Sequence, residues 1–281
     1  MASNDVVISA CGGGSPRIIY GTAWKEARTE RLVRTAIGCG FRGIDTACQP
    51  KHYNEAGVGA AVSACLKDGL SRTELYLQTK FTPLPGHDPK RIPYDPEATP
   101  AQQVAQSFDT SLRNLQTGYV DCLVLHSPIA DAREAAEVWR AMEAICDDGG
   151  AKQLGISNCY SLDDLERLHR TARIKPAVVQ NRFYAQTGYD RGIRAFCRQQ
   201  GMAYQSFWTL TANPRVLADA GVKALAAKYA RTPAQIFFRY LTQEGVIPLT
   251  GTTSPTHMHE DLAIFEFELT QSERGALSAL L

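Results

Sequence analysis

The chain of 281 residues lacks the features that mark several classes of protein. Its net charge is +1, with 30 basic and 29 acidic residues, so no electrostatic surface for nucleic acid or for a membrane is visible. No hydrophobic run approaches the length of a membrane span, and the opening MASNDVVISACGGGSP carries no basic segment typical of a signal peptide. These absences favour a cytoplasmic globular protein.

Closely spaced metal ligands and cysteine pairs are also missing. The eight cysteines are scattered without a CxxC pair, and the histidines show no HxxxH spacing. Metal sites and disulfide frameworks need such spacing. We therefore expect no metal, and we interpret the cysteines as reduced thiols of a cytosolic protein.

The sequence has no glycine-rich turn after a first strand, which a doubly wound nucleotide-binding sheet requires. The cluster CGGGSP at 11–16 precedes a predicted strand, so residues 1–16 are expected to be a flexible lead-in. Beyond them, short β-branched runs alternate with amphipathic helical segments. Strands are predicted at 17–23, 42–47, 75–81, 120–126, 152–157, 177–183, 202–208 and 246–251. Eight βαβ-type strands predict an α/β protein with a closed (β/α)8 TIM barrel, in a single domain over residues 1–281.

Capping residues mark several of the predicted helices. Thr29 is a plausible N-cap for a helix over 29–40, and Ser161 with Asp164 three residues later has a capping-box pattern. The segment 132–150 ends on glycines, as helices commonly do. These signals place helices between the predicted strands.

Polar side chains stand at the ends of the predicted strands. Asp45, Lys80 and His126 end the second, third and fourth strands. The fifth and sixth strands add Ser157, Asn158, Gln180 and Asn181. Taken singly, Asp45 could be a helix cap, Lys80 a surface lysine and His126 a core histidine. In a (β/α)8 barrel, however, the carboxyl ends of the strands form the active-site face, so together they predict a site that can tune a proton donor.

The stretches GIDTA…YNEAGVG, LYLQTKF, VDCLVLHSP, LGISN and VVQNRF, in this order between about residues 17 and 262, resemble those of the aldo-keto reductases. The resemblance implies reduction of an aldehyde or ketone to an alcohol, with NADPH lying across the barrel mouth. It also implies a catalytic set of Asp45, Lys80, His126 and a tyrosine. Ser157, Asn158 and Gln180 are implied to hold the cofactor's carboxamide.

The proton donor is to be chosen between His52 and Tyr53. The family spaces its tyrosine five residues after the aspartate, where this chain has Pro50, and counting back from Glu55 reaches His52. A tyrosine keeps its proton at neutral pH, and the ammonium of Lys80 is expected to lower its pKa toward a useful value. Histidine is mostly unprotonated there and is the poorer donor. We therefore predict Tyr53 as the acid, with His52 lining the substrate pocket.

The last predicted strand runs into TGTTSPTHMHEDL, where a helix start offers free N–H groups to a phosphate. The resemblance places the adenosine phosphate here. The predicted contacts are Thr250, Gly251, Thr252, Ser254 and His257. Many relatives carry Lys where this chain has Leu249 and Arg where it has His257, and histidine cannot imitate the guanidinium that a 2′-phosphate prefers. NADPH is the predicted cofactor, and NADH stays possible.

Aromatic residues around the barrel mouth predict the substrate pocket. The predicted contacts are Trp24, His52, Phe81 and Trp208. A proline-rich loop over 81–103 is long enough to be functional. The ring that stacks under the nicotinamide should come from YQSFW, where Gln205 competes for the position. The tail to Leu281 is shorter than in many relatives, which predicts an open pocket.

Two other functions stay open. Lys80 could act as the Schiff-base nucleophile of a barrel aldolase, although a partner carboxylate keeps a lysine protonated. A cofactor-binding regulatory subunit with weak turnover could keep the same fold. In each case we expect a monomer without nucleic-acid or membrane partners, and for the reductase a small carbonyl substrate.

Overall fold

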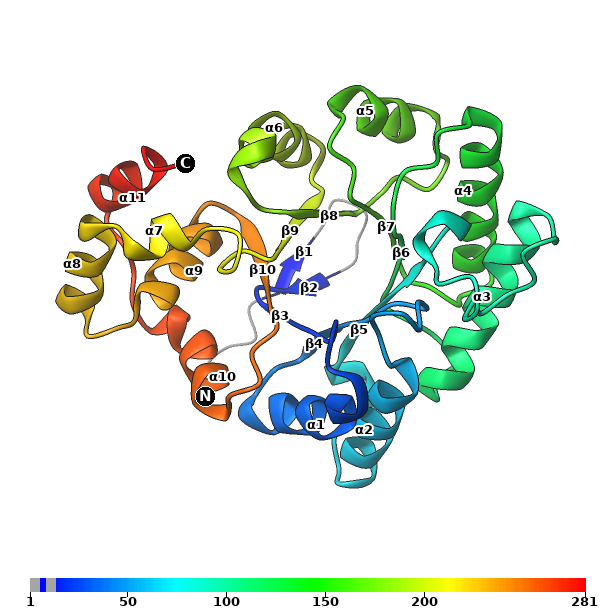
Figure 1. Ribbon diagram of the computed structural model, residues 1–281, viewed down its shortest axis with the longest axis horizontal. Coiled ribbons are helices and arrows are strands. Elements are labelled where there is room, and N and C mark those ends of the chain that lie inside the picture. The colour runs from blue at the N-terminus through cyan, green and yellow to red at the C-terminus, as the bar shows by residue number, and fades with distance from the viewer. Residues whose placement is uncertain (1–5, 9–13) are drawn as a thin grey trace.

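Eight short parallel strands close into a barrel at the centre of the computed structural model, which describes residues 6–8 and 14–281. The strands follow one another around the barrel in chain order, and the last pairs with the first (Figure 1). They are Ile19–Gly21 (β3), Gly43–Asp45 (β4), Tyr76–Phe81 (β5), Cys122–Leu125 (β6), Leu154–Ser157 (β7), Val178–Arg182 (β8), Ala203–Phe207 (β9) and Val246–Thr250 (β10). Each lies within a predicted range, so the predicted single-domain (β/α)8 barrel is confirmed.

Helices fill the connections and surround the barrel (Figure 1). They are Thr29–Cys39 (α1), Glu55–Lys67 (α2), Pro100–Leu115 (α3), Ala132–Asp147 (α4), Leu162–Thr171 (α5), Arg191–Gln200 (α6), Pro214–Ala218 (α7), Ala220–Tyr229 (α8), Pro233–Gln243 (α9), Pro255–Leu262 (α10) and Gln271–Ser278 (α11). Across the described ranges, none of these helices has the length and hydrophobicity needed to cross a membrane.

The helix starts agree with the sequence at α5 and differ at α1. Ser161 caps α5, where its hydroxyl oxygen accepts the N–H of Asp164 at 3.2 Å. Thr29 is not an N-cap, because the 3-10 turn Glu26–Arg28 runs directly into α1 and gives Thr29 helical backbone angles. Its hydroxyl instead donates to the carbonyl oxygen of Glu26 at 2.8 Å.

A short antiparallel hairpin lies across the middle of the ring of strands in Figure 1. Val6–Ile8 (β1) pairs with Gly14–Pro16 (β2). Pro16 packs against Gly43 at the amino end of β4, where an added methyl group would lie 3.0 Å from the proline ring. The hairpin therefore covers the end of the barrel opposite the polar strand ends. Six residues of the lead-in predicted for 1–16 thus form regular structure, and the others lie outside the described residues.

The barrel strands divide their side chains between two compartments. On β5, Leu77 and Phe81 face outward into the large core beneath the helices. Gln78 and Lys80 alternate with them and face inward. A second, smaller hydrophobic cluster consists of residues from the strands and their flanks alone, so it fills the inside of the barrel. Polar groups share this inner compartment and reach up toward the mouth.

Helices α2 and α3 approach closely at Gly59. A methyl group there would lie 2.0 Å from the backbone carbonyl oxygen of Asn114. Backbone cannot swing aside, so we expect Gly59→Ala to lower the free energy of unfolding by about 1–3 kcal/mol in urea denaturation. Gly38→Ala on α1 is the matched control, because nothing lies within 4 Å of its added methyl group. There we expect a gain of up to about 1 kcal/mol from helix propensity. Equal stability of the two variants would contradict this account.

Candidate active site

Asp45, the last residue of β4, and Lys80 on β5 form an ion pair inside the barrel. Lys80 Nζ lies 2.6 Å and 2.7 Å from the two carboxylate oxygens and 2.8 Å from the carbonyl oxygen of Thr46. Both side chains are almost fully buried. Charges that lose their water shell need partners of this kind. The structure therefore brings together two of the predicted catalytic residues.

Glutamine side chains from three strands support the Asp45 carboxylate. The Nε2 groups of Gln78 and Gln180 donate to Asp45 Oδ1 at 2.6 Å and 2.9 Å. Both also donate to Gln205 Oε1 at 2.9 Å. This network joins β4, β5, β8 and β9 across the barrel. Gln78 could have been found from the sequence, because strand alternation places it on the same face as Lys80.

Two sequence expectations change in this network. Gln180 was expected to hold the cofactor's carboxamide, yet its amide N–H groups are committed to Asp45 and Gln205. Gln205 was a competitor for the position under the nicotinamide, and it is fully buried below the mouth. The next inward-facing residue of β9 is Phe207, which is partly exposed and packs on the inner cluster.

The neighbours His52 and Tyr53 point in different directions. The Tyr53 ring centroid lies 5.2 Å from Lys80 Nζ and 6.0 Å from the ring of His126, which it meets edge-on. The His52 ring instead packs on Trp24, with ring centroids 3.9 Å apart. The structure thus brings Tyr53 to the buried ion pair and turns His52 toward the rim.

The Tyr53 phenol holds its proton more firmly than the sequence suggested. Burial raises its pKa above the ordinary value, and the carboxylate of Asp45 raises it further. Any lowering of this pKa by Lys80 is outweighed, so the net shift is upward. Asp45 binds the ammonium through both oxygens, so the ion pair presents little net positive charge to the phenol. Tyr53 stays protonated throughout the neutral range.

His126 follows β6 and is held from both sides. Its Nδ1 lies 2.7 Å from Thr82 Oγ1, and its carbonyl oxygen accepts the amide N–H of Asn158 at 2.8 Å. Burial lowers the pKa of the imidazole well below its usual range, and the charge of Lys80 lowers it further. The ring is therefore neutral at neutral pH. Thr82, which comes directly after β5, was not among the predicted residues.

The proline-rich loop after β5 folds back onto Thr82. The Tyr94 hydroxyl donates to the Thr82 carbonyl oxygen at 2.8 Å, and His87 Nε2 lies 2.9 Å from the same oxygen. Burial lowers the pKa of the His87 imidazole, so this ring is also neutral. The loop thus fixes the residue that orients His126.

Glu55, the first residue of α2, is a buried anchor beside the site. Its Oε1 accepts hydroxyl groups from Thr79 at 2.5 Å and Ser111 at 2.9 Å, and its Oε2 accepts the Asn114 amide at 3.3 Å. Burial raises the pKa of the Glu55 carboxyl, and these donors oppose that rise. The bonds tie the start of α2 to β5 and α3, which fixes the loop that carries Tyr53.

The N-terminus of α10 stands where β10 ends. Ser254 caps the helix by accepting the N–H of His257 at 3.4 Å, and its own N–H donates to Thr252 Oγ1 at 3.2 Å. His257 Nδ1 lies 3.5 Å from the same Thr252 oxygen. Together with Gly251 these residues are at least partly exposed. The structure therefore gathers four of the five predicted phosphate contacts.

Thr250 is the exception. Its side chain is buried and its hydroxyl donates to Asp261 Oδ2 at 2.6 Å, so it joins β10 to α10. Strand alternation explains this placement, because the preceding Leu249 faces the inside of the barrel and belongs to the inner hydrophobic cluster. Thr250 is thus a structural contact and is not part of the exposed cradle.

Lys25, in the loop after β3, was missed by the sequence reasoning. Its side chain is buried, and its ammonium donates to the carbonyl oxygen of Gly251. Among the residues described, no carboxylate forms an ion pair with it. Burial lowers the pKa of Lys25, and the nearby Arg28 lowers it further. A cation therefore lies beside the start of α10.

The predicted substrate aromatics separate into two groups. Trp24 and Trp208 are 55% and 49% exposed, and each has a left-handed backbone, with φ of 62° and 55°. Phe81 is buried in the outer core, where its ring lies 5.7 Å from that of Tyr94. Because it alternates with the inward-facing Lys80, Phe81 does not reach the mouth, and its prediction as a substrate contact is not supported by this placement.

The remaining predicted residues lie at the end of β7. Ser157 is buried, and its Oγ accepts the amide N–H of Asn158 at 3.3 Å. Asn158 has a left-handed backbone, with φ of 55°, which directs the chain away from the strand. In the described ranges, no group of three or more metal-ligating side chains converges here or elsewhere.

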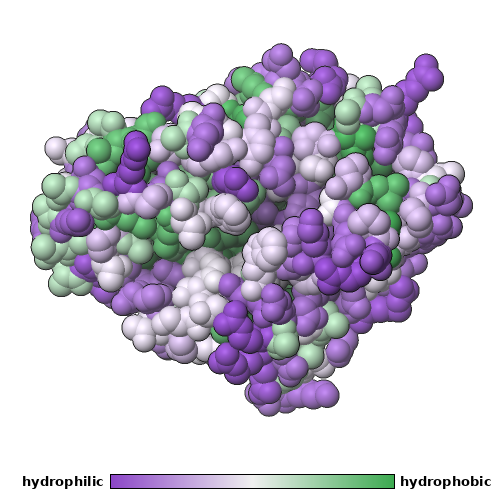
Figure 2. All heavy atoms as spheres, in the orientation of Figure 1, coloured by the Kyte–Doolittle hydropathy of each residue, from purple (hydrophilic) through white to green (hydrophobic). Residues whose placement is uncertain are grey.

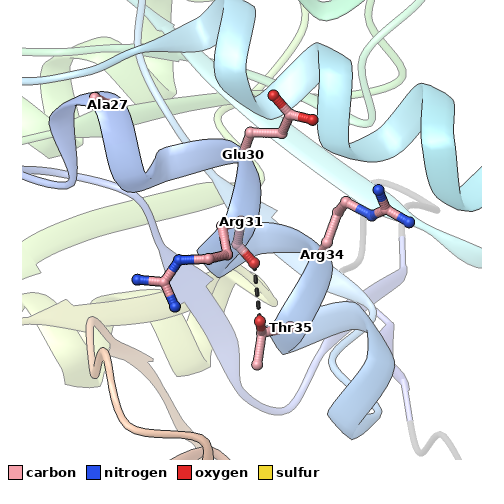
Figure 3. Close-up of a pocket in the computed structure, with 5 residues that line it drawn as sticks. All are labelled: Ala27, Glu30, Arg31, Arg34 and Thr35. Atoms are coloured by element: carbon pink, nitrogen blue, oxygen red, sulfur yellow. Dashed lines mark hydrogen bonds between the residues drawn. The ribbon is translucent and has the colours of Figure 1, made fainter.

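Two hollows mark the surface. Figure 2 shows one over the centre of the barrel, hydrophilic in its depth and bordered on one side by hydrophobic surface. The other, with a volume of ≈ 380 Å³, lies along α1 and is drawn in Figure 3. It is lined by Ala27, Glu30, Arg31, Arg34 and Thr35. Its two arginines point apart, and no residue of the Asp45–Lys80 network lines it. We therefore place the chemistry at the barrel mouth.

A buried acid–lysine pair, a protonated phenol and a neutral imidazole at one barrel mouth form a site that can give a proton to a reacting oxygen. The profile of the Aldo/keto reductase family matches residues 12–281. The uncharacterized oxidoreductase YtbE of Bacillus subtilis (strain 168) is 30% identical over 249 residues, which are 88% of this chain and 82% of that protein. Glyoxal reductase of the same organism is 29% identical over 248 residues, with the same two shares of 88% and 82%.

Solved structures agree with the sequence matches. The crystal structure of an aldo/keto reductase from Brucella melitensis superposes with a TM-score of 0.84 at 28% identity, covering 99% of this chain and 100% of that one. The chain belongs to the aldo/keto reductase family. It is an NAD(P)H-dependent oxidoreductase of the class that reduces carbonyl groups.

Asp261 generates a prediction about stability and pH. Burial raises its pKa from 3.8 to about 6. Between these values the folded protein binds a proton that the unfolded chain releases, so the free energy of unfolding falls as the pH rises toward about 6. Asp261→Asn should remove the part of this slope that Asp261 causes, leaving that of Glu55, and make the protein about 1–3 kcal/mol more stable than wild type at neutral pH. Its amide oxygen can still accept from Thr250.

Urea denaturation at about pH 4 and about pH 7 measures the slope. Asp109→Asn, an exposed position on α3, is the matched control and should leave the wild-type slope unchanged. A slope that is unchanged in Asp261→Asn would assign it to another carboxylate.

Proposed function

We propose that this chain reduces an aldehyde or ketone with hydride from NADPH and a proton from Tyr53. The observation that carries the proposal is the direction of the Tyr53 ring, which faces Lys80 and His126 while His52 packs on Trp24. Tyr53 stands eight residues after Asp45, three more than the spacing of the family, and its ring still faces Lys80.

The proposed reaction requires proton donors from the chain at the carbonyl oxygen of the substrate. NADPH, when bound, supplies the hydride, and negative charge then develops on the carbonyl oxygen. The Tyr53 hydroxyl donates its proton to that oxygen, and the ammonium of Lys80 faces the ring that becomes a phenolate. Asp45 holds the ammonium in place through two short bonds. Lys80 therefore stabilises the phenolate that forms after proton transfer. It affects the phenol before the transfer less.

His126 offers a second donor to the same oxygen. We assign the tautomer in which Nδ1 accepts the hydroxyl of Thr82, so the ring proton is on Nε2. A neutral imidazole can orient a carbonyl by this N–H without losing its proton. Thr82 is therefore a positioning residue in the proposal.

The residues around the mouth fit a dinucleotide. Lys25 and the N-terminus of α10 offer a cation and free N–H groups to phosphate oxygens. Asn158 and Ser157 would meet the carboxamide, together with the amide oxygen of Gln180, whose N–H groups are committed to the barrel interior. We propose Phe207 as the ring under the nicotinamide, because it is the partly exposed aromatic that faces inward on β9.

NADPH is proposed over NADH, with its 2′-phosphate at Ser254 and His257. Both side chains stand at the start of α10, where the helix dipole favours an anion. The mouth offers no arginine in the position where many relatives carry one, so we expect the preference for NADPH to be modest.

The two alternative functions, a Schiff-base aldolase and a regulatory subunit, make different demands on the site. A Schiff-base aldolase needs a free amine at Lys80, whereas the three oxygens within 2.8 Å of Nζ occupy all of its N–H bonds. A regulatory subunit with weak turnover keeps every structural feature and differs only in rate. Measured turnover with a carbonyl substrate separates it from the reductase.

We also propose a cytoplasmic location and a monomeric state. The seven cysteines within the described ranges are free thiols, as is common in reducing compartments. The substrate is proposed to be a small molecule, and glyoxal reductase of Bacillus subtilis is one relative with a small carbonyl compound in its name.

Tyr53→Phe tests the proposed acid. Loss of one preorganised donor typically costs about 10²–10³ in rate, so we expect kcat for aldehyde reduction to fall at least that far. The oxidation of NADPH is followed by absorbance with a panel of simple aldehydes and ketones. His52→Ala is the matched control, and its kcat should stay within about threefold because its ring packs on Trp24. A large loss in His52→Ala with activity retained in Tyr53→Phe would reverse the assignment.

His257→Ala tests the cofactor site. Loss of this contact should raise KM for NADPH about 3- to 10-fold and leave KM for NADH unchanged, because only NADPH carries the 2′-phosphate. His259→Ala, an exposed position on the same helix, is the control and should change neither value. Equal changes for the two cofactors in His257→Ala would place this histidine away from the 2′-phosphate.

A further inference from the structure

Arg182, the last residue of β8, carries a guanidinium group that the described residues leave without a hydrogen bond or an ion pair. Its Nε is buried and has no acceptor. Arg231, Arg239 and Arg274 also have a buried nitrogen without an acceptor, but each forms an ion pair with a glutamate. Among the residues described, Arg182 forms none. A buried N–H without an acceptor costs free energy, so this group is suited to an acceptor supplied from outside the chain.

Aromatic rings hold the guanidinium in place. Its central carbon lies 4.2 Å from the ring centroid of Trp208 and 5.2 Å from that of Tyr184. The ring of Tyr160 meets Tyr184 edge-on, with centroids 6.2 Å apart. Cation–π contacts orient a cation without neutralising it. We call Arg182, Trp208, Tyr184 and Tyr160 the arginine–aromatic cluster, and it presents an uncompensated positive charge.

Hydrogen bonds connect this cluster to the catalytic side of the mouth. The N–H of Arg182 donates to the Tyr160 hydroxyl at 3.1 Å, and that hydroxyl donates to Asn158 Oδ1 at 3.3 Å. Asn158 Nδ2 in turn donates to the carbonyl oxygen of His126. Arg182 also follows Gln180 by two residues on β8, so its backbone is one pleat nearer the mouth than the polar barrel interior.

We propose that the arginine–aromatic cluster binds an anionic group of the carbonyl substrate, so that this enzyme prefers aldehyde or oxo acids to neutral carbonyl compounds. The proposal rests on the proposed reductase function. A guanidinium suits a carboxylate or a phosphate because its N–H groups form paired, charge-assisted bonds with their oxygens. Trp208 and Tyr184 add flat hydrophobic surface for the rest of the substrate. The cofactor's own phosphates share this anionic chemistry, and the experiment separates the two sources.

Kinetics with a matched pair of aldehydes test the substrate side. For Arg182→Gln we expect KM for 4-carboxybenzaldehyde to rise about 10- to 100-fold and KM for benzaldehyde to change less than about twofold. Arg182→Lys should recover part of the loss, since it keeps the charge without the paired geometry. Arg215→Gln removes an exposed charge of the same sign from α7 and should leave both KM values unchanged. Equal changes for the two aldehydes in Arg182→Gln would overturn the proposal.

Binding without turnover makes the result independent of the reductase function. Titration with benzoate and with benzamide, followed by tryptophan fluorescence, reads the cluster directly through Trp208. Arg182→Gln should weaken benzoate binding about tenfold or more and leave benzamide binding unchanged. That outcome supports anion binding at the arginine–aromatic cluster even if the wild-type protein reduces neither aldehyde. Unchanged benzoate binding would overturn it.

The Kd for NADPH in the same variants identifies the source of the anion. We expect Arg182→Gln to leave this Kd unchanged. A Kd that rises tenfold, with no discrimination between the two aldehydes, would assign the guanidinium to the cofactor and overturn the substrate assignment. Circular dichroism of each variant confirms that the barrel is folded.

Discussion

The ion pair between Asp45 and Lys80 is the interaction on which the rest of the site depends. Two opposite charges inside a barrel are tolerated only because each is fully hydrogen-bonded, and removing one partner leaves the other buried and uncompensated. Thr46, Gln78 and Gln180 supply the remaining hydrogen bonds to the pair. Burial and the nearby carboxylate of Asp45 raise the pKa of Tyr53, which keeps the phenol protonated.

The mouth is divided electrically into two halves. Around β4, β5 and β6 the charges are compensated within the chain, and His126 is neutral. On the side of β8, β9 and β10, Arg182 and Lys25 have no carboxylate partner among the residues described. The proposed proton transfer therefore lies where the charges are balanced, and the proposed sites for anionic groups lie in the other half. Such a division lets one site bind phosphate or carboxylate groups without disturbing its acid.

Much of the fold follows from sequence pattern, because period-two strands and capped helices are local properties. The strand-end rule for barrels also finds Asp45, Lys80 and His126. What sequence could not supply were the contacts that arise only when the barrel closes, such as Gln205 bonding across to Gln78. Alternation within single strands was available from the sequence and places Phe81 and Thr250 on the outer face of the barrel, away from the inward-facing Lys80 and Leu249.

The placement of Tyr53 shows a similar limit. Its choice over His52 could be argued from chemistry, but its direction depends on how α2 begins, and that is fixed by Glu55 bonding to residues far along the chain. Its pKa depends on its burial and on the nearby carboxylate of Asp45. Neither the direction of the ring nor its burial can be read from the local sequence.

The β1–β2 hairpin covers the amino end of the barrel, where Pro16 packs near Gly43 and Ser15 is buried. The polar strand ends face the opposite side. In the proposed reaction Tyr53 gives up its proton at that side, where the product also sits. We therefore expect the phenolate to regain a proton from water only after the product has left.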